Sequence, residues 1–210
     1  SGNTGSATLN KNVTTYDATI KHSGNYSAKL QSQYVALFGI GAFAAGNVFV
    51  GKFLKIDGTD GILRFGRPFT SRPSKLVLYY RYVAGTVDYS TLGELPKNSK
   101  DMGSIYIALG DWPHQTFEGE TDIPVLVKTK PADRQLFDSN SSNVIGYGEC
   151  ILKESTEGEG LIKLEIPINY RSNRKPTDII LVGSASRYGD YFTGSTGSTL
   201  WLDDLELIYE

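Results

Sequence analysis

The segment of residues 184–194 sets two tyrosines around a carboxylate, as Tyr188, Asp190 and Tyr191. Sugar recognition uses such groups, because an aromatic ring covers the C–H face of a pyranose while a carboxylate binds neighbouring hydroxyls. Since loop residues carry function more often than strand residues do, we expect these three to bind a ligand. The alternative is that Tyr188 and Phe192 pack in the core and Asp190 caps a turn.

Hydrolysis of a glycosidic bond needs two carboxylates about 5 to 9.5 Å apart. We take Asp190 and Glu149 as the candidate catalytic pair. Other acidic residues in suitable segments are Asp88, Glu94 and Asp111. Spacing along the chain cannot measure their separation. No Gly-x-Ser-x-Gly or other nucleophile motif accompanies them.

Five further residues are candidate ligand contacts. Arg67 and Arg72 each precede a proline, which favours extended backbone and would hold each guanidinium on a stiff segment. Pairing with an acidic residue is an equally good interpretation of both. The other three are aromatic: Tyr80 and Tyr82 on one face of an expected strand, and Trp112 after another, where burial is the commoner fate.

Asp203 and Asp204 interrupt the apolar alternation of the last expected strand. Strict alternation would point one of them toward the core, where a carboxylate needs hydrogen-bond donors, an arginine or a hard cation. We favour hydrogen bonding over a structural calcium ion, because calcium takes about six to eight oxygens. We expect no other cofactor.

Composition excludes several classes of protein. The net charge of -2 and the sequence pI of 5.8 argue against nucleic-acid binding, which needs a basic surface. Glycines interrupt the longest apolar stretch, residues 35–50, so we expect no membrane span. The single Cys150 allows no disulfide within the chain. Residues 39–44 match Gly-x-Gly-x-x-Ala, but no strand–helix–strand pattern follows, which favours close backbone packing or a sharp turn over a nucleotide site.

The elements that must position these residues are strands. Residues 75–83 alternate with period two, and both faces are partly apolar, as in a central strand. Similar runs are 26–31, 62–65, 104–109, 123–128, 144–152, 161–168, 179–185 and 200–209. Turn-rich segments separate them, so we predict an all-β protein, an antiparallel β-sandwich or jelly roll. Residues 16–210 form one expected domain, preceded by a disordered or linker segment, 1–15.

Several segments together resemble the putative carbohydrate metabolism domain of Bacteroidetes. They are residues 45–51, 66–73, 79–82, 145–149, 175–177, 184–194 and 202–205, of which 184–194 is the most specific. The resemblance implies a jelly roll similar to carbohydrate-binding modules. It also implies a further domain before this one, and an exported protein in the periplasm or at the cell surface with a lipid anchor.

The resemblance and the residues together lead us to expect a non-catalytic domain that binds an oligosaccharide or polysaccharide. The first alternative is a glycoside hydrolase or lyase that acts on a complex glycan. The second is a structural or adhesin domain with a protein partner.

Overall fold

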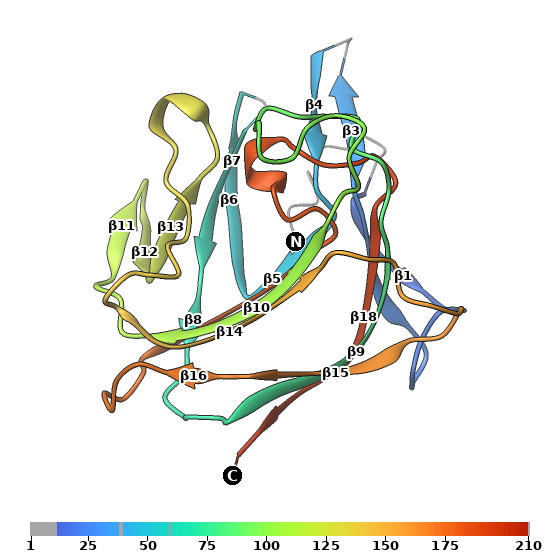
Figure 1. The fold of residues 1–210 in the computed structure, drawn as a ribbon. Helices are drawn as coiled ribbons and strands as arrows, with labels where there is room; N and C mark the ends of the chain where they lie inside the picture. Colours follow the sequence, from blue (N-terminus) through green and yellow to red (C-terminus); the bar gives the residue numbers. More distant parts are fainter. Residues whose placement is uncertain (1–11, 38–39, 59, 210) are drawn as a thin grey trace.

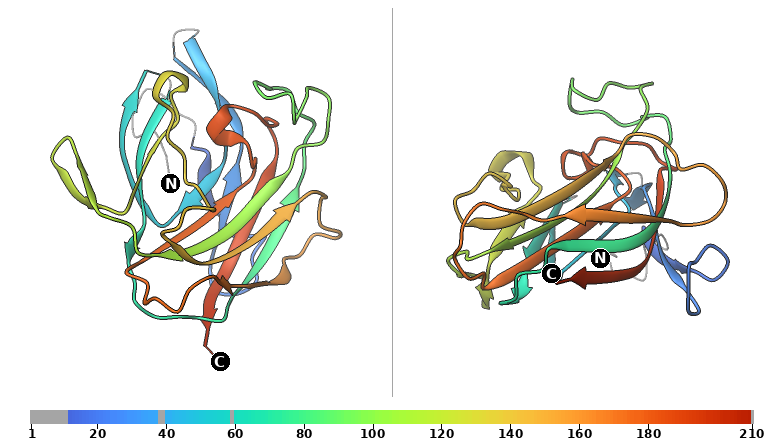
Figure 2. Two further views of the ribbon diagram at one scale, coloured as in Figure 1. Left: turned by 60° about the vertical axis from the view of Figure 1, so that its left-hand side comes forward. Right: turned by 60° about the horizontal axis from the view of Figure 1, so that its bottom comes forward.

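The computed structural model describes residues 12–37, 40–58 and 60–209, and it is built almost wholly from antiparallel strands (Figure 1). The prediction of an all-β sandwich is confirmed. Its two larger sheets are the broad layers of Figures 1 and 2. Within the described residues, no helix has the length and apolar character needed to cross a membrane.

The first sheet has five strands in the order β1-β2-β18-β9-β15. Their bounds are Thr14–Asp17 for β1, Ser27–Gln31 for β2, Thr199–Ile208 for β18, Lys75–Val83 for β9 and Ile162–Pro167 for β15.

The second sheet runs in the order β16-β14-β10-β17-β5, with β8 also paired to β17. The bounds are Asn169–Tyr170 (β16), Val144–Leu152 (β14), Gly103–Gly110 (β10), Asp178–Ser184 (β17), Asn47–Phe49 (β5) and Arg67–Pro68 (β8). Apart from the pair β1–β2, the neighbouring strands of both sheets are not consecutive in the sequence. This order is compatible with the jelly-roll connectivity expected above.

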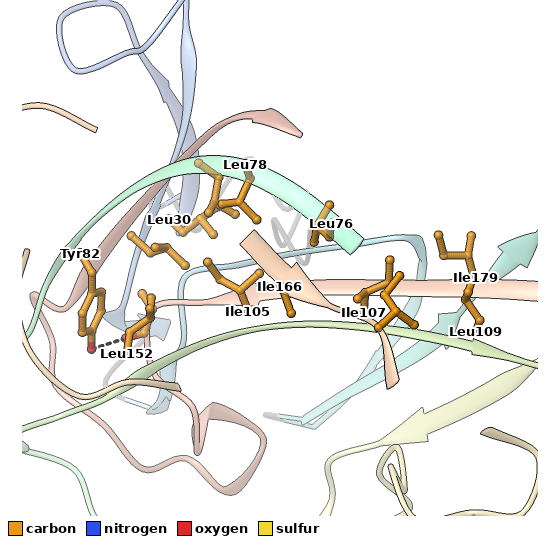
Figure 3. Close-up of a cluster of buried hydrophobic side chains, with 14 residues drawn as sticks. Leu30, Leu76, Leu78, Tyr82, Ile105, Ile107, Leu109, Leu152, Ile166 and Ile179 are labelled. Carbon is orange, nitrogen blue, oxygen red and sulfur yellow. Dashed lines mark hydrogen bonds between the residues drawn. The ribbon is translucent and has the colours of Figure 1, made fainter. Parts of the chain in front are cut away.

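The main hydrophobic core lies between these two sheets (Figure 3). Leu78 and Leu200 of the first sheet and Ile105 and Ile107 of the second are completely buried. Tyr82 is completely buried among them, and its hydroxyl donates a hydrogen bond to the carbonyl of Ala185 at 3.0 Å. Every second residue of β10 and β17 therefore points into this core and stabilises the sandwich.

A third sheet, β13-β7-β6, packs beside the other face of the second sheet. Its strands are Val125–Lys128 (β13), Asp60–Phe65 (β7) and Gly51–Asp57 (β6). Phe65 and Val127 of this sheet contact Ala108, Ile180 and Val182 of the second sheet in a second apolar cluster. The second sheet therefore has core on both faces over part of its length.

Two hairpins and two short helices complete the fold. The hairpins are β3–β4, Gln33–Leu37 and Ile40–Ala44, and β11–β12, Gln115–Phe117 and Glu120–Ile123. The 3₁₀ helices are η1, Pro131–Asp133, and η2, Gly189–Tyr191. Both helices lie outside the sandwich core.

The predicted strands agree closely with the observed ones. Residues 75–83 and 144–152 are β9 and β14 with the same bounds. The run 123–128 is divided at Pro124, because proline cannot donate to a strand ladder. Strand β1 begins at Thr14, within the segment 1–15 predicted to be linker, whereas residues 1–11 lie outside the described part.

The glycine-rich segment at 39–44 is strand β4 from Ile40 on, and Gly39 lies outside the described residues. Close backbone packing occurs just beyond this segment, at Gly46, which belongs to the resembling segment 45–51. A Cβ atom there would lie 2.2 Å from the backbone nitrogen of Gln31.

Candidate functional site

The loop that follows β17, residues 185–198, is fixed to the sandwich by one buried carboxylate. Asp101 is completely buried and accepts hydrogen bonds from the hydroxyl of Ser198 at 2.7 Å and the backbone nitrogen of Ser195 at 2.8 Å. Burial raises the pKa of Asp101, while these bonds lower it. At the beginning of the loop, the nitrogen of Arg187 donates to the carbonyl of Met102 at 2.7 Å. The loop is thus tied down at both ends.

Tyr106 and Glu149 lie on the face of the second sheet that points away from the main core. They are direct partners in the antiparallel register of β10 and β14, so their side chains share one face. Tyr147 precedes Glu149 by two residues and therefore lies on that face as well. All three are partly exposed.

Glu149 is held by an arginine from the loop. The Nη1 atom of Arg187 forms an ion pair with Oε1 of Glu149. Both side chains are mostly buried, with 28% of Arg187 and 20% of Glu149 exposed. A charge-assisted bond in such a setting fixes the direction of the carboxylate.

Aromatic rings gather beside this pair. The ring of Phe137 stacks on Tyr106 with centroids 5.4 Å apart and planes 7° from parallel, and Tyr147 lies 6.1 Å from Tyr106. Burial raises the pKa of Tyr106, and the negative charges of Asp190 and Glu149 add to that shift. Burial and the neighbouring Glu149 raise the pKa of Tyr147 to about 12. Both phenols are therefore neutral hydrogen-bonding groups at physiological pH.

Asp190 differs from the other carboxylates of this region. The residue is exposed to solvent, yet the protein around its carboxyl group raises the pKa of that group, and the charge of Arg134 only partly opposes the shift. Within the described ranges, it has no hydrogen-bond or ion-pair partner. Because the residue is exposed and no protein group binds its carboxylate in the described part of the chain, both oxygens are accessible to a ligand.

Asp190 lies between Tyr188 and Tyr191 in the loop, and the local backbone is held in place on both sides of it. Helix η2 ends at Tyr191, and its C-cap residue Phe192 has a left-handed φ of 53°. Gly189 fits against Ala45, where a Cβ would come within 2.3 Å of the alanine Cβ. Tyr188 and Tyr191 meet edge to face at 6.5 Å. The guanidinium of Arg134 lies over the ring of Tyr191 at 4.8 Å.

These contacts define one cluster, which we call the Tyr106 site. It comprises Tyr106, Tyr147 and Glu149 of the sheet, Arg134 and Phe137 after η1, and Arg187, Tyr188, Asp190 and Tyr191 of the loop. Four predicted residues, Glu149, Tyr188, Asp190 and Tyr191, belong to it. The charges of both candidate catalytic carboxylates contribute to the raised pKa of Tyr106.

Two predicted ligand contacts are corrected, because the structure buries them. Tyr82 has no exposed surface and its hydroxyl is bonded to Ala185. Trp112 is 8% exposed, packs over Gly110 and meets Phe137 edge to face at 6.3 Å. Strand alternation could not separate them from surface aromatics, since a tyrosine or tryptophan fits either place.

Three other predicted contacts lie outside the Tyr106 site. Arg67 is exposed on β8. Arg72 stacks on Tyr170 at 4.0 Å and donates to the carbonyls of Arg174 and Ser172 at 2.5 and 3.0 Å. Tyr80 faces the main core from β9. Arg72 is thereby a structural clamp between two loops.

The two aspartates of β18 show why strict alternation failed. A bulge between Asp203 and Glu206, with a φ of 47° at Asp204, shifts the register, so neither carboxylate points into the core. Asp203 accepts from the backbone nitrogen of His22 at 2.8 Å, and Asp204 contacts the His22 ring at 2.7 Å. The described residues contain no group of three or more His, Cys, Asp or Glu side chains suited to a metal. The prediction of an inward aspartate was wrong.

Sequence reasoning missed Tyr106, Tyr147, Phe137 and Arg134 as site residues. The spacing of Tyr147 and Glu149 could have indicated a shared face. Nothing in the sequence connects the segment after η1 with residues 188–191, because that contact depends on tertiary packing.

Comparison with known proteins places this geometry in context. The sequence profile of a family described as "Putative carbohydrate metabolism domain" matches residues 1–208. No match is found among curated proteins.

Two solved structures share the fold. One is named a putative glycoside hydrolase from Bacteroides thetaiotaomicron, with a TM-score of 0.66 and 22% identity. The other has the same designation and comes from Bacteroides vulgatus, with a TM-score of 0.65 and 24% identity. The alignments cover 95% and 94% of this chain but 57% and 78% of those two chains. At these identities the likeness establishes the fold.

Proposed function

Because the chain belongs to the family of the putative carbohydrate metabolism domain, we propose that it binds a glycan at the Tyr106 site. The observation that carries this proposal is the meeting of aromatic and charged side chains from three separate segments around Tyr106. Tyrosine rings offer apolar faces to a sugar, while charged groups fix its hydroxyls. The expected export belongs to the same proposal, since a polysaccharide outside the cell is met only by an exported protein.

A glycan array with the purified protein tests the proposal. We expect specific binding that Tyr191→Ala weakens by ~1 kcal/mol or more, since one aromatic contact is lost. Tyr26→Ala is the matched control, because Tyr26 is 57% exposed on the β1–β2 connection and lies outside the site. An array without specific binding would contradict the proposal, and so would equal effects of the two substitutions. A protein partner, as in a structural or adhesin domain, would then be the better hypothesis.

Hydrolysis of the bound glycan is a second candidate function, favoured by the contrast between the two carboxylates. Asp190 has a raised pKa and no partner among the described residues, whereas Glu149 is oriented by Arg187. A proton donor and a second, ionised carboxylate are the groups that glycosidases use. Release of reducing ends from a polysaccharide panel would support this candidate. Asp190→Asn should abolish that release but weaken binding far less, because the amide oxygen still accepts a hydrogen bond.

A further inference from the structure

Of the two arginines in the Tyr106 site, Arg134 is the one whose terminal hydrogen-bond donors have no protein partner among the described residues. Its Nε atom donates to the carbonyl of Thr129 at 3.1 Å, and its guanidinium lies over Tyr191. The terminal Nη groups have no hydrogen-bond partner in the described part of the chain. A half-buried guanidinium whose Nη donors have no protein partner can bind a hydrogen-bond acceptor from a ligand.

Asp190 attracts Arg134 but does not pair with it. The guanidinium of Arg134 lies 4.8 Å from the ring of Tyr191, the residue that follows Asp190, and its positive charge lowers the pKa of the Asp190 carboxyl group. No ion pair within 4.0 Å joins them in the structure as described. Elsewhere Arg174 and Asp111 do form such a pair at 2.8 Å. The site therefore keeps an open donor next to an open acceptor.

A second arginine adds positive charge to the same place. The guanidinium of Arg171 lies over Tyr147 at 5.6 Å, and its Nη1 atom donates to the carbonyl of Ser139. It has no carboxylate partner within the described ranges. Arg187 is already paired with Glu149. A ligand would therefore meet two guanidinium groups, Arg134 within the site and Arg171 beside it, that no carboxylate pairs in the described part of the chain.

We infer that the ligand of the Tyr106 site is an acidic glycan whose sugar carboxylate binds the terminal Nη groups of Arg134. The inference rests on the proposed glycan binding and adds the class of glycan. A planar guanidinium matches a carboxylate through two parallel hydrogen bonds. A hydroxyl of the same uronic acid residue can donate to Asp190, and the C–H face of its ring can lie against a tyrosine of the site.

Titration with oligosaccharides of matched length tests the class of ligand. The acidic probes are oligogalacturonate, hyaluronan oligosaccharide, alginate oligosaccharide and sialylated oligosaccharide, and the neutral ones are galactan and xylan oligosaccharides. A sulfated carrageenan oligosaccharide separates carboxylate recognition from general attraction to anions. We expect at least one carboxylated probe to bind about tenfold or more tightly than every neutral or sulfated probe. Its affinity should fall as the sodium chloride concentration rises from 50 to 500 mM, because charge attraction is screened.

Substitutions of Arg134 and Arg72, which both stack on a tyrosine, test whether Arg134 binds the ligand. Arg134→Ala should weaken binding of the acidic probe at least tenfold, and Arg134→Lys should weaken it less but measurably, because lysine keeps the charge without the fork. Arg72→Ala is the matched control, since Arg72 also stacks on a tyrosine but lies outside the site. Circular dichroism of each variant shows whether it is folded, and Arg134→Lys serves if the alanine variant is not.

Three outcomes would overturn the inference. One is equal or tighter binding of neutral or sulfated probes, and another is equal loss of affinity in the Arg134 and Arg72 variants. In both cases glycan binding itself would stand. The third is the absence of binding to any probe or to a glycan array, which would remove the proposed function as well.

Discussion

The hydroxyl of Ser186 donates a hydrogen bond to Oδ2 of Asp101 at 2.6 Å, and both residues are completely buried. The same oxygen accepts from Ser195 and Ser198, at the far end of the loop that carries Asp190. A single carboxylate oxygen therefore joins the two ends of the loop. The geometry of the Tyr106 site depends on a residue that does not belong to it.

Replacing Asp101 by alanine should lower the free energy of unfolding by about 3 kcal/mol or more, because several buried donors lose their acceptor. Denaturant unfolding measures the loss. Hydrogen exchange should also quicken at residues 187–194 more than in β9 or β10. Asp88→Ala is the control, since Asp88 binds Thr196 in an exposed setting. Equal effects of the two substitutions would contradict the role of Asp101.

Tyr82→Phe should cost about 1 kcal/mol of stability, because the ring still fills the core but the bond to Ala185 is lost. Glycan binding should not change, as Tyr82 has no exposed surface. Thermal unfolding and a binding titration check both expectations. If the variant lost affinity at unchanged stability, Tyr82 would have to contact the ligand after all.

Asp190→Asn should raise the melting temperature at pH 7 but not at pH 3. The pKa of Asp190 is raised in the folded protein. Stability is therefore lost as pH rises from the ordinary value of 3.8 through the native pKa, and the loss persists at higher pH. The amide removes that loss. Calorimetry at the two pH values measures the difference, and an unchanged or lower melting temperature at pH 7 would refute the expectation.

Gly46→Ala should destabilise the protein by about 2 kcal/mol or more, because the added Cβ would overlap the backbone of Leu30 and Gln31. Gly93→Ala is the control, since nothing lies within 4 Å of a Cβ built there. Urea unfolding distinguishes the two. Similar midpoints would mean that β2 can move away from Gly46 at little cost.

The strands could be predicted because alternation is a local property of the sequence. Strand β9 shows this, because its residues alternate between two partly apolar faces and its bounds are those of the predicted run 75–83. The bulge at Asp203 could not be predicted in this way. It depends on the pairing of β18 with β9 and on the hydrogen bonds that Asp203 and Asp204 form with the segment before β2.

The candidate site was predictable only where the sequence keeps its members together. Tyr188, Asp190 and Tyr191 lie within four residues, so their common role could be expected. Arg134 and Tyr106 come from segments whose meeting with that loop is decided by the tertiary fold. Tyr82 and Trp112 were misplaced because aromatic residues serve cores and binding surfaces equally well.

Adjacent residues of β14 in the second sheet have their side chains on opposite faces, and the two faces serve different roles. On β14, Tyr147 and Glu149 face the Tyr106 site, while Gly148 and Cys150 face the sandwich core. Insertion of one residue at the beginning of this strand would exchange the two sets. It would put a charge into the core and remove one from the site, whereas two inserted residues would restore the order. An odd change in the length of this strand would therefore exchange its two faces, whereas an even change would keep them.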